Sequence, residues 1–355
     1  DGALRQRVWT PAVGGAQGGR TLLLESLHAP AKMSGDLMTV FQAANGDYWF
    51  SSYTGGAFRY DGKTVVRFNS SDGLPADRVE GVQQDKKGDL FFSTPEGVSR
   101  FDGKSFTTLV PVKSAAPDKG WRLGPDDLWF KGKTGPLRYD GKSLYDLEFG
   151  AYPRRDVADA FFKGLPKVPW SPFEIYSMYR DRRGHMWFGT GNFGACRFDG
   201  KSLTWIYERH HINMPQGPMF GVRSMFEDKR GRYWFCNTRH RYDIQQADAA
   251  SAADGLARYR TEPGIERYRF PDGEDETYFM SVVDDAQGDL WMATFGLGVF
   301  RYDGKTVTHH PVKDDRGAPV TLFSITKDNR GDLWLGTQRS GAFKFNGKSF
   351  ERFNP

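Results

Sequence analysis

Two short segments of this 355-residue chain gather side chains that can move protons and neutralise charge: YERHHINMP (207–215) and NTRHRYD (237–243). A neutral imidazole can take a proton, a guanidinium can neutralise the anion that forms, and a phenol can return the proton. This is the set that β-elimination needs. The candidate catalytic residues are His211, His240, Tyr176 and Arg223. The alternative is a solvated basic loop without a catalytic role.

Four histidines could in principle meet to hold a metal ion: His28, His211, His240 and His310. Copper or iron sites of this kind need three or four converging imidazoles and an open position. The sequence has no HxH or HExxH spacing that would fix a pair, so no motif requires a cofactor and a metal stays open. If His210 and His211 lie on a strand, at most one of them faces inward.

A repeat positions these residues. The aromatic anchors Trp49, Phe91, Trp129, Trp187, Trp234, Trp291 and Trp334 recur, and a Gly stands three residues earlier in six copies. Asp-x-x-Gly closes a tight turn before most anchors, and Asp-Gly or Asn-Gly follows as a hairpin signal. Each copy therefore reads as four strands, which we call A to D in chain order. Seven such copies predict an all-β, seven-bladed β-propeller of four-stranded antiparallel blades, with strand A innermost.

The predicted domain organisation is an extension or linker over 1–36 and one propeller over 37–355. The segment TLLLESL within 1–36 is expected to be a strand or a short helix that packs on the propeller. Two insertions interrupt the repeat, at 148–174 between strands D and A and at 237–258 between strands B and C. The first carries apolar residues at helical spacing and predicts a small lid helix near 151–170.

The position eleven residues before each anchor holds very different side chains: Met38, Glu80, Asp118, Tyr176, Arg223, Met280 and Phe323. At the start of an innermost strand these residues would surround the mouth of a central channel and form a ligand site. The alternative is a set of charges that neutralise one another around trapped water. Loops at the same rim add further candidates, so the predicted ligand-binding residues are Tyr53, Glu80, Asp118, Asn192, Phe193, Arg239, Phe295 and Arg339.

Composition excludes several classes of protein. The net charge is +5, but the Lys and Arg residues are dispersed and form no run, so we expect no nucleic-acid partner. No apolar stretch reaches eighteen residues, so we expect no membrane span. Two cysteines, Cys196 and Cys236, cannot form a disulfide framework, and both read as small core residues. The chain begins with Asp1, and we expect any signal peptide to have been removed.

The repeated text, as in GDLWMATFGLGVFRYDGKTV (288–307), resembles the two-component regulator propeller repeat. The resemblance covers roughly residues 37 to 353. It implies an extracytoplasmic (periplasmic or secreted) propeller that senses a ligand, for which a glycan, a small molecule or a peptide are the expected classes.

Three functions are compatible with the sequence. The first is ligand binding over the central channel beneath the 148–174 insertion. The second is a lyase or hydrolase using the His, Arg and Tyr set, for which replacing His211 or His240 is expected to abolish turnover with little change in stability. The third is a scaffold that binds a protein partner through the 148–174 insertion.

Overall fold

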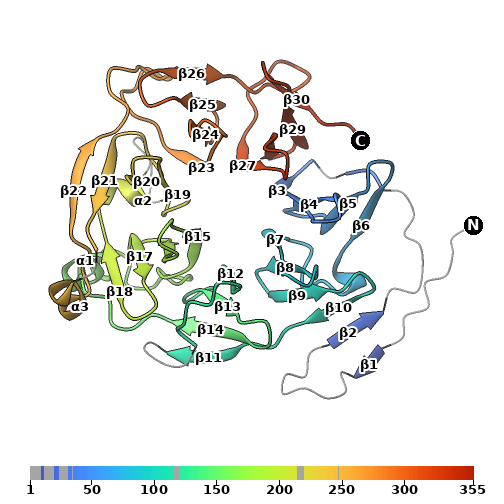
Figure 1. The fold of residues 1–355 in the computed structure, drawn as a ribbon, viewed down its shortest axis with the longest axis horizontal. Coiled ribbons are helices and arrows are strands. Elements are labelled where there is room, and N and C mark those ends of the chain that lie inside the picture. Colours follow the sequence, from blue (N-terminus) through green and yellow to red (C-terminus); the bar gives the residue numbers. More distant parts are fainter. Residues whose placement is uncertain are drawn as a thin grey trace, which may run out of the picture. The chain divides into compact units, whose positions relative to one another are not determined.

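The computed structural model describes residues 31–33, 35–115, 120–213, 220–246 and 248–355, and the backbone of 9–11 and 20–23. It contains seven sheets of four or more strands, which are the seven blades of a β-propeller, as the sequence predicts (Figure 1). The chain divides into two compact units. The first unit comprises Asp1–Pro111, Gly141–Leu144 and His310–Pro355, and the second comprises Val112–Asp140 and Tyr145–His309.

The first unit holds blades 1, 2 and 7. Their strands are β3 (Leu37–Gln42), β4 (Tyr48–Ser52), β5 (Ala57–Tyr60) and β6 (Val65–Phe68) in blade 1; β7 (Gly81–Gln84), β8 (Leu90–Thr94), β9 (Gly97–Phe101) and β10 (Ser105–Thr108) in blade 2; and β27 (Leu322–Lys327), β28 (Leu333–Thr337), β29 (Ala342–Phe345) and β30 (Phe350–Arg352) in blade 7. A 3-10 turn, η1 (Ser70–Asp72), follows β6. Blade 7 is therefore complete from its own four strands.

Blade 2 is widened by the N-terminal segment. Strand β2 (Arg20–Leu23) pairs with β10, and β1 (Trp9–Pro11) pairs with β2, so this sheet has six strands in the order β1-β2-β10-β9-β8-β7. Within TLLLESL (21–27), Thr21, Leu22 and Leu23 lie in this strand, and the rest of the segment lies outside the described residues.

The second unit holds blades 3 to 6. Their strands are β11 (Val112–Ala115), β12 (Leu128–Phe130), β13 (Leu137–Tyr139) and β14 (Leu144–Glu148) in blade 3; β15 (Ile175–Arg180), β16 (Met186–Thr190), β17 (Ala195–Phe198) and β18 (Leu203–Ile206) in blade 4; β19 (Met225–Glu227), β20 (Tyr233–Phe235), β21 (His240–Ile244) and β22 (Tyr259–Pro263) in blade 5; and β23 (Phe279–Asp284), β24 (Leu290–Thr294), β25 (Val299–Tyr302) and β26 (Val307–His310) in blade 6. Three helices complete it: α1 (Arg155–Gly164), α2 (Arg209–Ile212) and α3 (Ala249–Asp254).

Blade 3 departs from the expected strand order. Its first strand, β11, does not pair with β12 but lies beyond β14, to which it is parallel. The expectation that strand A is innermost in every copy is therefore wrong here. This copy carries Pro117 where strand A was expected, and proline has no N–H to donate to a ladder. Asp118, a predicted ligand-binding residue, lies outside the described residues.

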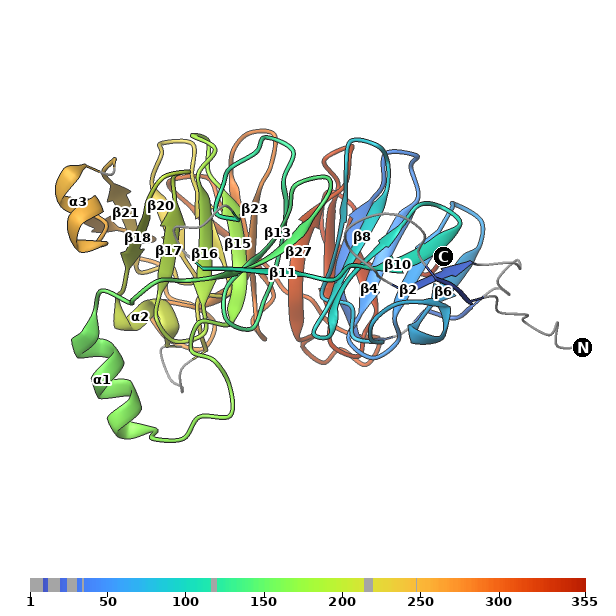
Figure 2. The same cartoon turned by 90° about the horizontal axis from the view of Figure 1, so that it is seen from below.

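The two insertions also differ from each other. The first holds the predicted helix, α1, between strands D and A. The segment 237–258 is not one loop between strands B and C, because strand C (β21) begins within it at His240 and α3 follows between strands C and D. As a result α1 and α3 lie at opposite ends of the blades of the second unit (Figure 2).

The Asp of the Asp-x-x-Gly turn joins the turn to the core. In blade 4, Asp181 Oδ1 accepts the backbone N–H groups of Arg183 and His185 at 3.0 and 2.9 Å, and Oδ2 accepts Trp187 Nε1 at 3.0 Å. The same carboxylate–indole bond recurs from Asp228 to Trp234, from Asp285 to Trp291 and from Asp328 to Trp334. The repeated Asp therefore satisfies a buried indole as well as a turn.

A β-bulge opens strand A in four blades. The register of the A–B ladder shifts between Leu37 and Thr39, Ile175 and Ser177, Phe279 and Ser281, and Leu322 and Ser324. The residues passed over are Met38, Tyr176, Met280 and Phe323, which hold the variable position found in the sequence. A bulge turns a side chain out of the regular alternation. This explains why the residue type at this position varies from copy to copy.

Candidate functional site

The guanidinium of Arg223 is held between two aromatic rings of the second unit. Its Cζ lies 4.1 Å from the ring centroid of Tyr176 and 4.5 Å from that of Phe220, and its Nε donates to the carbonyl of Phe220 at 2.9 Å. The ring of Phe220 contacts Phe295 at 5.9 Å, and Phe295 is 41% exposed. We call Tyr176, Phe220, Arg223 and Phe295 the Arg223 cluster. The structure thus brings together three residues that the sequence singled out and adds Phe220.

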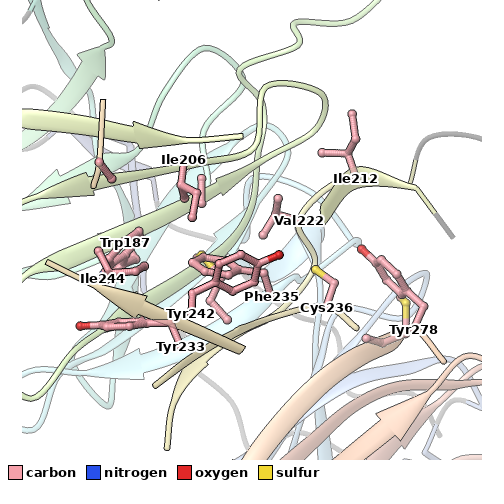
Figure 3. Packing of buried hydrophobic residues seen from close by; sticks show 14 residues of the cluster. Trp187, Ile206, Ile212, Val222, Tyr233, Phe235, Cys236, Tyr242, Ile244 and Tyr278 are labelled. Atoms are coloured by element: carbon pink, nitrogen blue, oxygen red, sulfur yellow. The ribbon is translucent and has the colours of Figure 1, made fainter. Parts of the chain in front are cut away.

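The backbone beneath Arg223 is fixed by a buried thiol. Cys236 has a positive φ of 56°, and its Sγ accepts the N–H groups of Arg223 and Ser224 at 3.0 and 3.3 Å. Tyr278 lies beside Cys236 in the same core and donates its hydroxyl to the carbonyl of Gly221 (Figure 3). Burial raises the pKa of the Cys236 thiol to about 11. The thiol is therefore neutral at pH 7 and acts as a structural acceptor, and both cysteines are buried and free.

Glycines let these side chains approach the backbone. A Cβ at Gly221, whose φ is +79°, would stand 2.3 Å from the ring of Tyr176. A Cβ at Gly191 would stand 3.5 Å from the same ring, and its neighbour Asn192 accepts a hydrogen bond from Trp170 Nε1 at 3.0 Å. Trp170 is 42% exposed. Gly191 and Asn192 therefore link the Arg223 cluster to the exposed ring of Trp170.

Helix α1 covers a cavity of about 420 Å³ next to Asn192. Helix α1 contributes Val157 and Phe161 to the lining, α2 contributes Ile212, and loops of the blades contribute Tyr207 and Asn192. No residue of α1 is fully buried. The cavity is mostly apolar with a few polar groups, which is the composition of small-molecule sites.

Phe193, predicted as a ligand-binding residue, is instead part of the core. It is 1% exposed, and its ring stacks on that of Tyr152 at 4.5 Å. Phe161 of α1 packs against its edge at 5.6 Å. The sequence places Phe193 next to Asn192 in a loop, but the side chain anchors α1 and does not reach solvent.

Three histidines of the second unit, His210 and His211 of α2 and His240 of β21, form a cluster. The ring centroid of His210 lies 4.9 Å from that of His211 and 5.2 Å from that of His240. His210 Nε2 hydrogen-bonds the hydroxyl of Tyr242. Burial lowers the pKa of His210 to about 4 and also lowers that of His240. Both imidazoles are therefore neutral at pH 7 and retain a basic nitrogen.

His211 is fully buried, in contrast to the expected loop position. The pair His210–His211 lies in α2 and not on a strand. The ring of His211 stacks on Phe235 at 4.8 Å, and neither of its nitrogens has a hydrogen-bond partner among the described residues. Burial lowers its pKa well below the ordinary value. The expectation that His211 can be replaced at little cost in stability is therefore wrong, and His210 is the accessible member of the pair.

Three of the metal candidates, His211, His240 and His310, lie among the described residues. Among the described residues, no three His, Cys, Asp or Glu side chains are grouped so that they could hold a metal ion. His211 and His240 belong to the second unit and His310 to the first, where its ring packs on Phe345. His28 lies outside the described residues. Arg239, which precedes His240 in the sequence, is exposed and pairs with Glu276 at 3.5 Å.

The first unit has a guanidinium–aromatic cluster of its own. Arg78 lies over the exposed ring of Tyr53 at 4.7 Å and pairs with Glu80 at 2.8 Å, while Phe323 stacks on Tyr53 at 6.3 Å. Arg339 has a φ of 67°, and its N–H donates to Asp36 at 3.1 Å. Tyr53 and Glu80 are thus brought together as predicted residues of one cluster, and Arg78 was not foreseen.

Sequence reasoning did not single out Trp170, Phe220 or Tyr242, and it named His210 only as the neighbour of His211. Phe220 stands three residues before Arg223, close enough for its carbonyl to bind the same guanidinium. Trp170 lies between two prolines in the 148–174 insertion. A large aromatic residue in such a loop is a signal that could have identified it as a candidate for the site. No pattern in the sequence marks Tyr242.

Comparison with known proteins supports the fold. Residues 174–192 match the profile of the family described as "Two component regulator propeller". No curated protein matches the sequence significantly. Among the described residues, no helix is long and apolar enough to cross a membrane.

Two kinds of solved structure are similar to this chain. The extracellular domain of a protein described as a hybrid two component system from B. thetaiotaomicron is 19% identical, with a TM-score of 0.55 over 93% of this chain. This chain spans only 40% of that one. A streptogramin B lyase structure is 11% identical, with a TM-score of 0.59 over 91% of this chain and 96% of that one.

The virginiamycin B lyase from Staphylococcus aureus is 12% identical, with a TM-score of 0.57 over 88% of this chain and 95% of that one. At these identities the structural similarity concerns the fold alone. The predicted resemblance is nevertheless confirmed: residues 174–192 match the two-component regulator propeller model, and the chain folds as a seven-bladed propeller.

Proposed function

We propose that this chain is an extracytoplasmic, sensor-like propeller that binds a small molecule or glycan on the α1 side of the second unit. The ligand would lie against the Arg223 cluster and extend toward Trp170 and the cavity under α1. The observation that carries this proposal is the fixed guanidinium between Tyr176 and Phe220, beside the exposed ring of Phe295. The similarity of this chain to the extracellular domain of a two component system supports an extracytoplasmic location.

The chemistry of this surface favours a hydroxylated ligand. Exposed aromatic faces such as Phe295 and Trp170 offer flat apolar area at little entropic cost, which suits the C–H faces of sugar rings. Arg223 supplies donors only, and the Asn192 amide lines the adjoining cavity. Because Arg223 is already oriented by its two rings, little rotamer entropy is lost when a ligand binds.

Titration calorimetry with neutral and acidic oligosaccharides tests the proposal. Trp170→Ala and Arg223→Met should each weaken binding about tenfold or more, as is typical of an aromatic or Arg residue central to a site. Val112→Ala, which changes another exposed apolar side chain of the second unit, is the matched control and should leave the affinity unchanged. Tyr53→Ala reports separately whether the cluster of the first unit contributes.

We also propose an alternative function, an elimination reaction, because the neutral imidazoles of His210 and His240 lie in one cluster with Tyr242. In this alternative His210 or His240 is the base, Arg223 neutralises the anion, and Tyr176 returns the proton. The His240→Ala and His210→Gln variants should then lose turnover of a uronate-containing or lactone substrate by about 10²-fold or more while still binding it. If the wild type binds the substrate without turning it over, the elimination reaction is ruled out and the sensor proposal stands.

A further inference from the structure

The turn side of blades 1 and 2 contains a cavity of about 370 Å³, wholly within the first unit. This volume is about twelve times that of one water in the liquid, which is ~30 Å³. The cavity is formed by the A–B turns of both blades and the C–D turn of blade 2. It is separate from the site proposed above, and its test does not depend on that proposal.

A buried hydrogen-bond donor in the cavity wall has no acceptor. Trp49 lines the cavity and is only 2% exposed, yet its Nε1 has no partner among the described residues. In blades 4 to 7 the corresponding indole donates to the Asp six residues earlier. In blade 1 that residue is Ala43, which cannot accept. An unsatisfied buried N–H is costly, so an acceptor from outside the chain is favoured at this point.

The equivalent place between blades 5 and 6 provides an internal comparison. There Asp228 and Lys229 stand where blade 1 has Ala43 and Ala44, and the cavity is about 20 Å³. Asp228 accepts the indole of Trp234 at 3.0 Å. The glycine and leucine positions in the wall are the same in both places. Two short side chains therefore open the larger cavity and leave its indole unsatisfied.

The charges of the wall select against an anion. Asp47 pairs with Arg59 at 2.6 Å, and Asp102 adds a second carboxylate, so these groups sum to one negative charge. A carboxylate that took the place of the missing Asp side chain would be repelled. The two carboxylates instead offer acceptors for hydroxyl donors, and Trp49 and Phe101 offer apolar faces.

We propose that this cavity binds a small neutral polyol of monosaccharide size, one oxygen of which accepts the Trp49 indole N–H. The ligand's other hydroxyls donate to the carboxylates of Asp47 and Asp102. Its ring lies between the apolar walls.

The indole N–H resonances of the ten tryptophans provide the test, with the Trp49 peak assigned by its loss in Trp49→Phe. Titration with D-glucose in the millimolar range should shift the Trp49 peak saturably. The Trp234 peak, whose donor is already bonded to Asp228, should stay in place. Ala43→Asp combined with Ala44→Lys copies the closed site and should abolish the glucose-induced shift.

Two outcomes would overturn the proposal. One is a Trp49 peak that moves with neither D-glucose nor glycerol in the wild type, which would show that water alone satisfies the indole. The other is a shift produced by sodium acetate and not by glucose, which would assign the cavity to a carboxylate. The wild-type titration decides between these outcomes even if the double variant does not fold.

Discussion

At the residue scale, one copy of the repeat lacks an ion pair that the others keep. The Asp two residues before the anchor pairs with a cation of strand C in Asp47–Arg59, Asp89–Arg100, Asp127–Arg138, Asp289–Arg301 and Asp332–Lys344. Blade 5 reverses the charges, with Arg232 bonded to Asp243 and Glu262. In blade 4 His185 replaces the Asp. Arg197 there is 2% exposed, and its Nε and Nη2 have no partner among the described residues.

Replacing His185 with Asp should therefore stabilise the protein. The new carboxylate would accept from a buried guanidinium that bonds the carbonyl of Gln245 and lies over the ring of Trp187, and we expect a gain of about 1–3 kcal/mol in the free energy of unfolding. Urea denaturation measures it. His185→Asn has a similar shape without the charge and should gain much less. A lower urea midpoint for His185→Asp would contradict this account of Arg197.

The buried histidines predict a loss of stability toward acid. The pKa of His210 is lowered to about 4 and that of His211 lies well below its ordinary value, so both stay neutral in the folded protein when the unfolded chain takes up protons. Stability is complete above pH 6.5 and falls as the pH decreases from there. One such histidine accounts for about 2 kcal/mol between pH 7.5 and 5.

His211→Phe keeps a ring on Phe235 but cannot be protonated. Unfolding free energies measured at several pH values should therefore decrease less steeply in this variant than in the wild type. His309→Phe changes a partly exposed histidine that hydrogen-bonds Leu297, and it serves as the comparison. Equal slopes for wild type and His211→Phe would show that His211 does not cause the acid sensitivity.

At the scale of elements, α1 is attached more loosely than the blades. None of its residues is buried, whereas every residue of the neighbouring strand β16 is. Local opening of such a helix needs little free energy. The amides of α1 should exchange with deuterium about 100-fold faster than those of β16. Equal protection would show that α1 is an integral part of the second unit.

The sequence predicts the blades well because each one is specified locally. Its anchors, Asp-x-x-Gly turns and Asp-Gly hairpins lie within about forty residues and need no distant partner. Where these local signals are missing, the prediction fails. Blade 5 has no Asp-Gly-Lys hairpin, so strand C and the insertion with α3 were misplaced.

The candidate site is less predictable, since its side chains come from several blades. Spacing identified Tyr176 and Arg223 because both stand eleven residues before an anchor, but the second ring over Arg223 comes from Phe220 in a loop. His211 and Phe193 carry no local mark of burial, because α2 and α1 bury them through tertiary packing. Sequence position alone therefore separates polar candidates poorly from core residues.

At the scale of the whole molecule, the N-terminal strands protect the outer edge of blade 2. Strand β2 pairs with β10 through Ser105, Phe106 and Thr107. A chain that lacks residues 1–30 should still fold, since blades 1, 2 and 7 each keep four strands, but it would expose β10 as an edge. Exposed edges promote association. Light scattering should show concentration-dependent oligomers for the shortened chain, and a monodisperse monomer would argue against a protective role.

The most direct test of the account is calorimetric titration of the wild type and Arg223→Met with the oligosaccharide that first binds in a panel of neutral and acidic sugars. We predict saturable binding by the wild type and an affinity reduced about tenfold or more in the variant, with the melting temperature unchanged. Equal affinity in both proteins, or no binding of any sugar by the wild type, would contradict the proposed site.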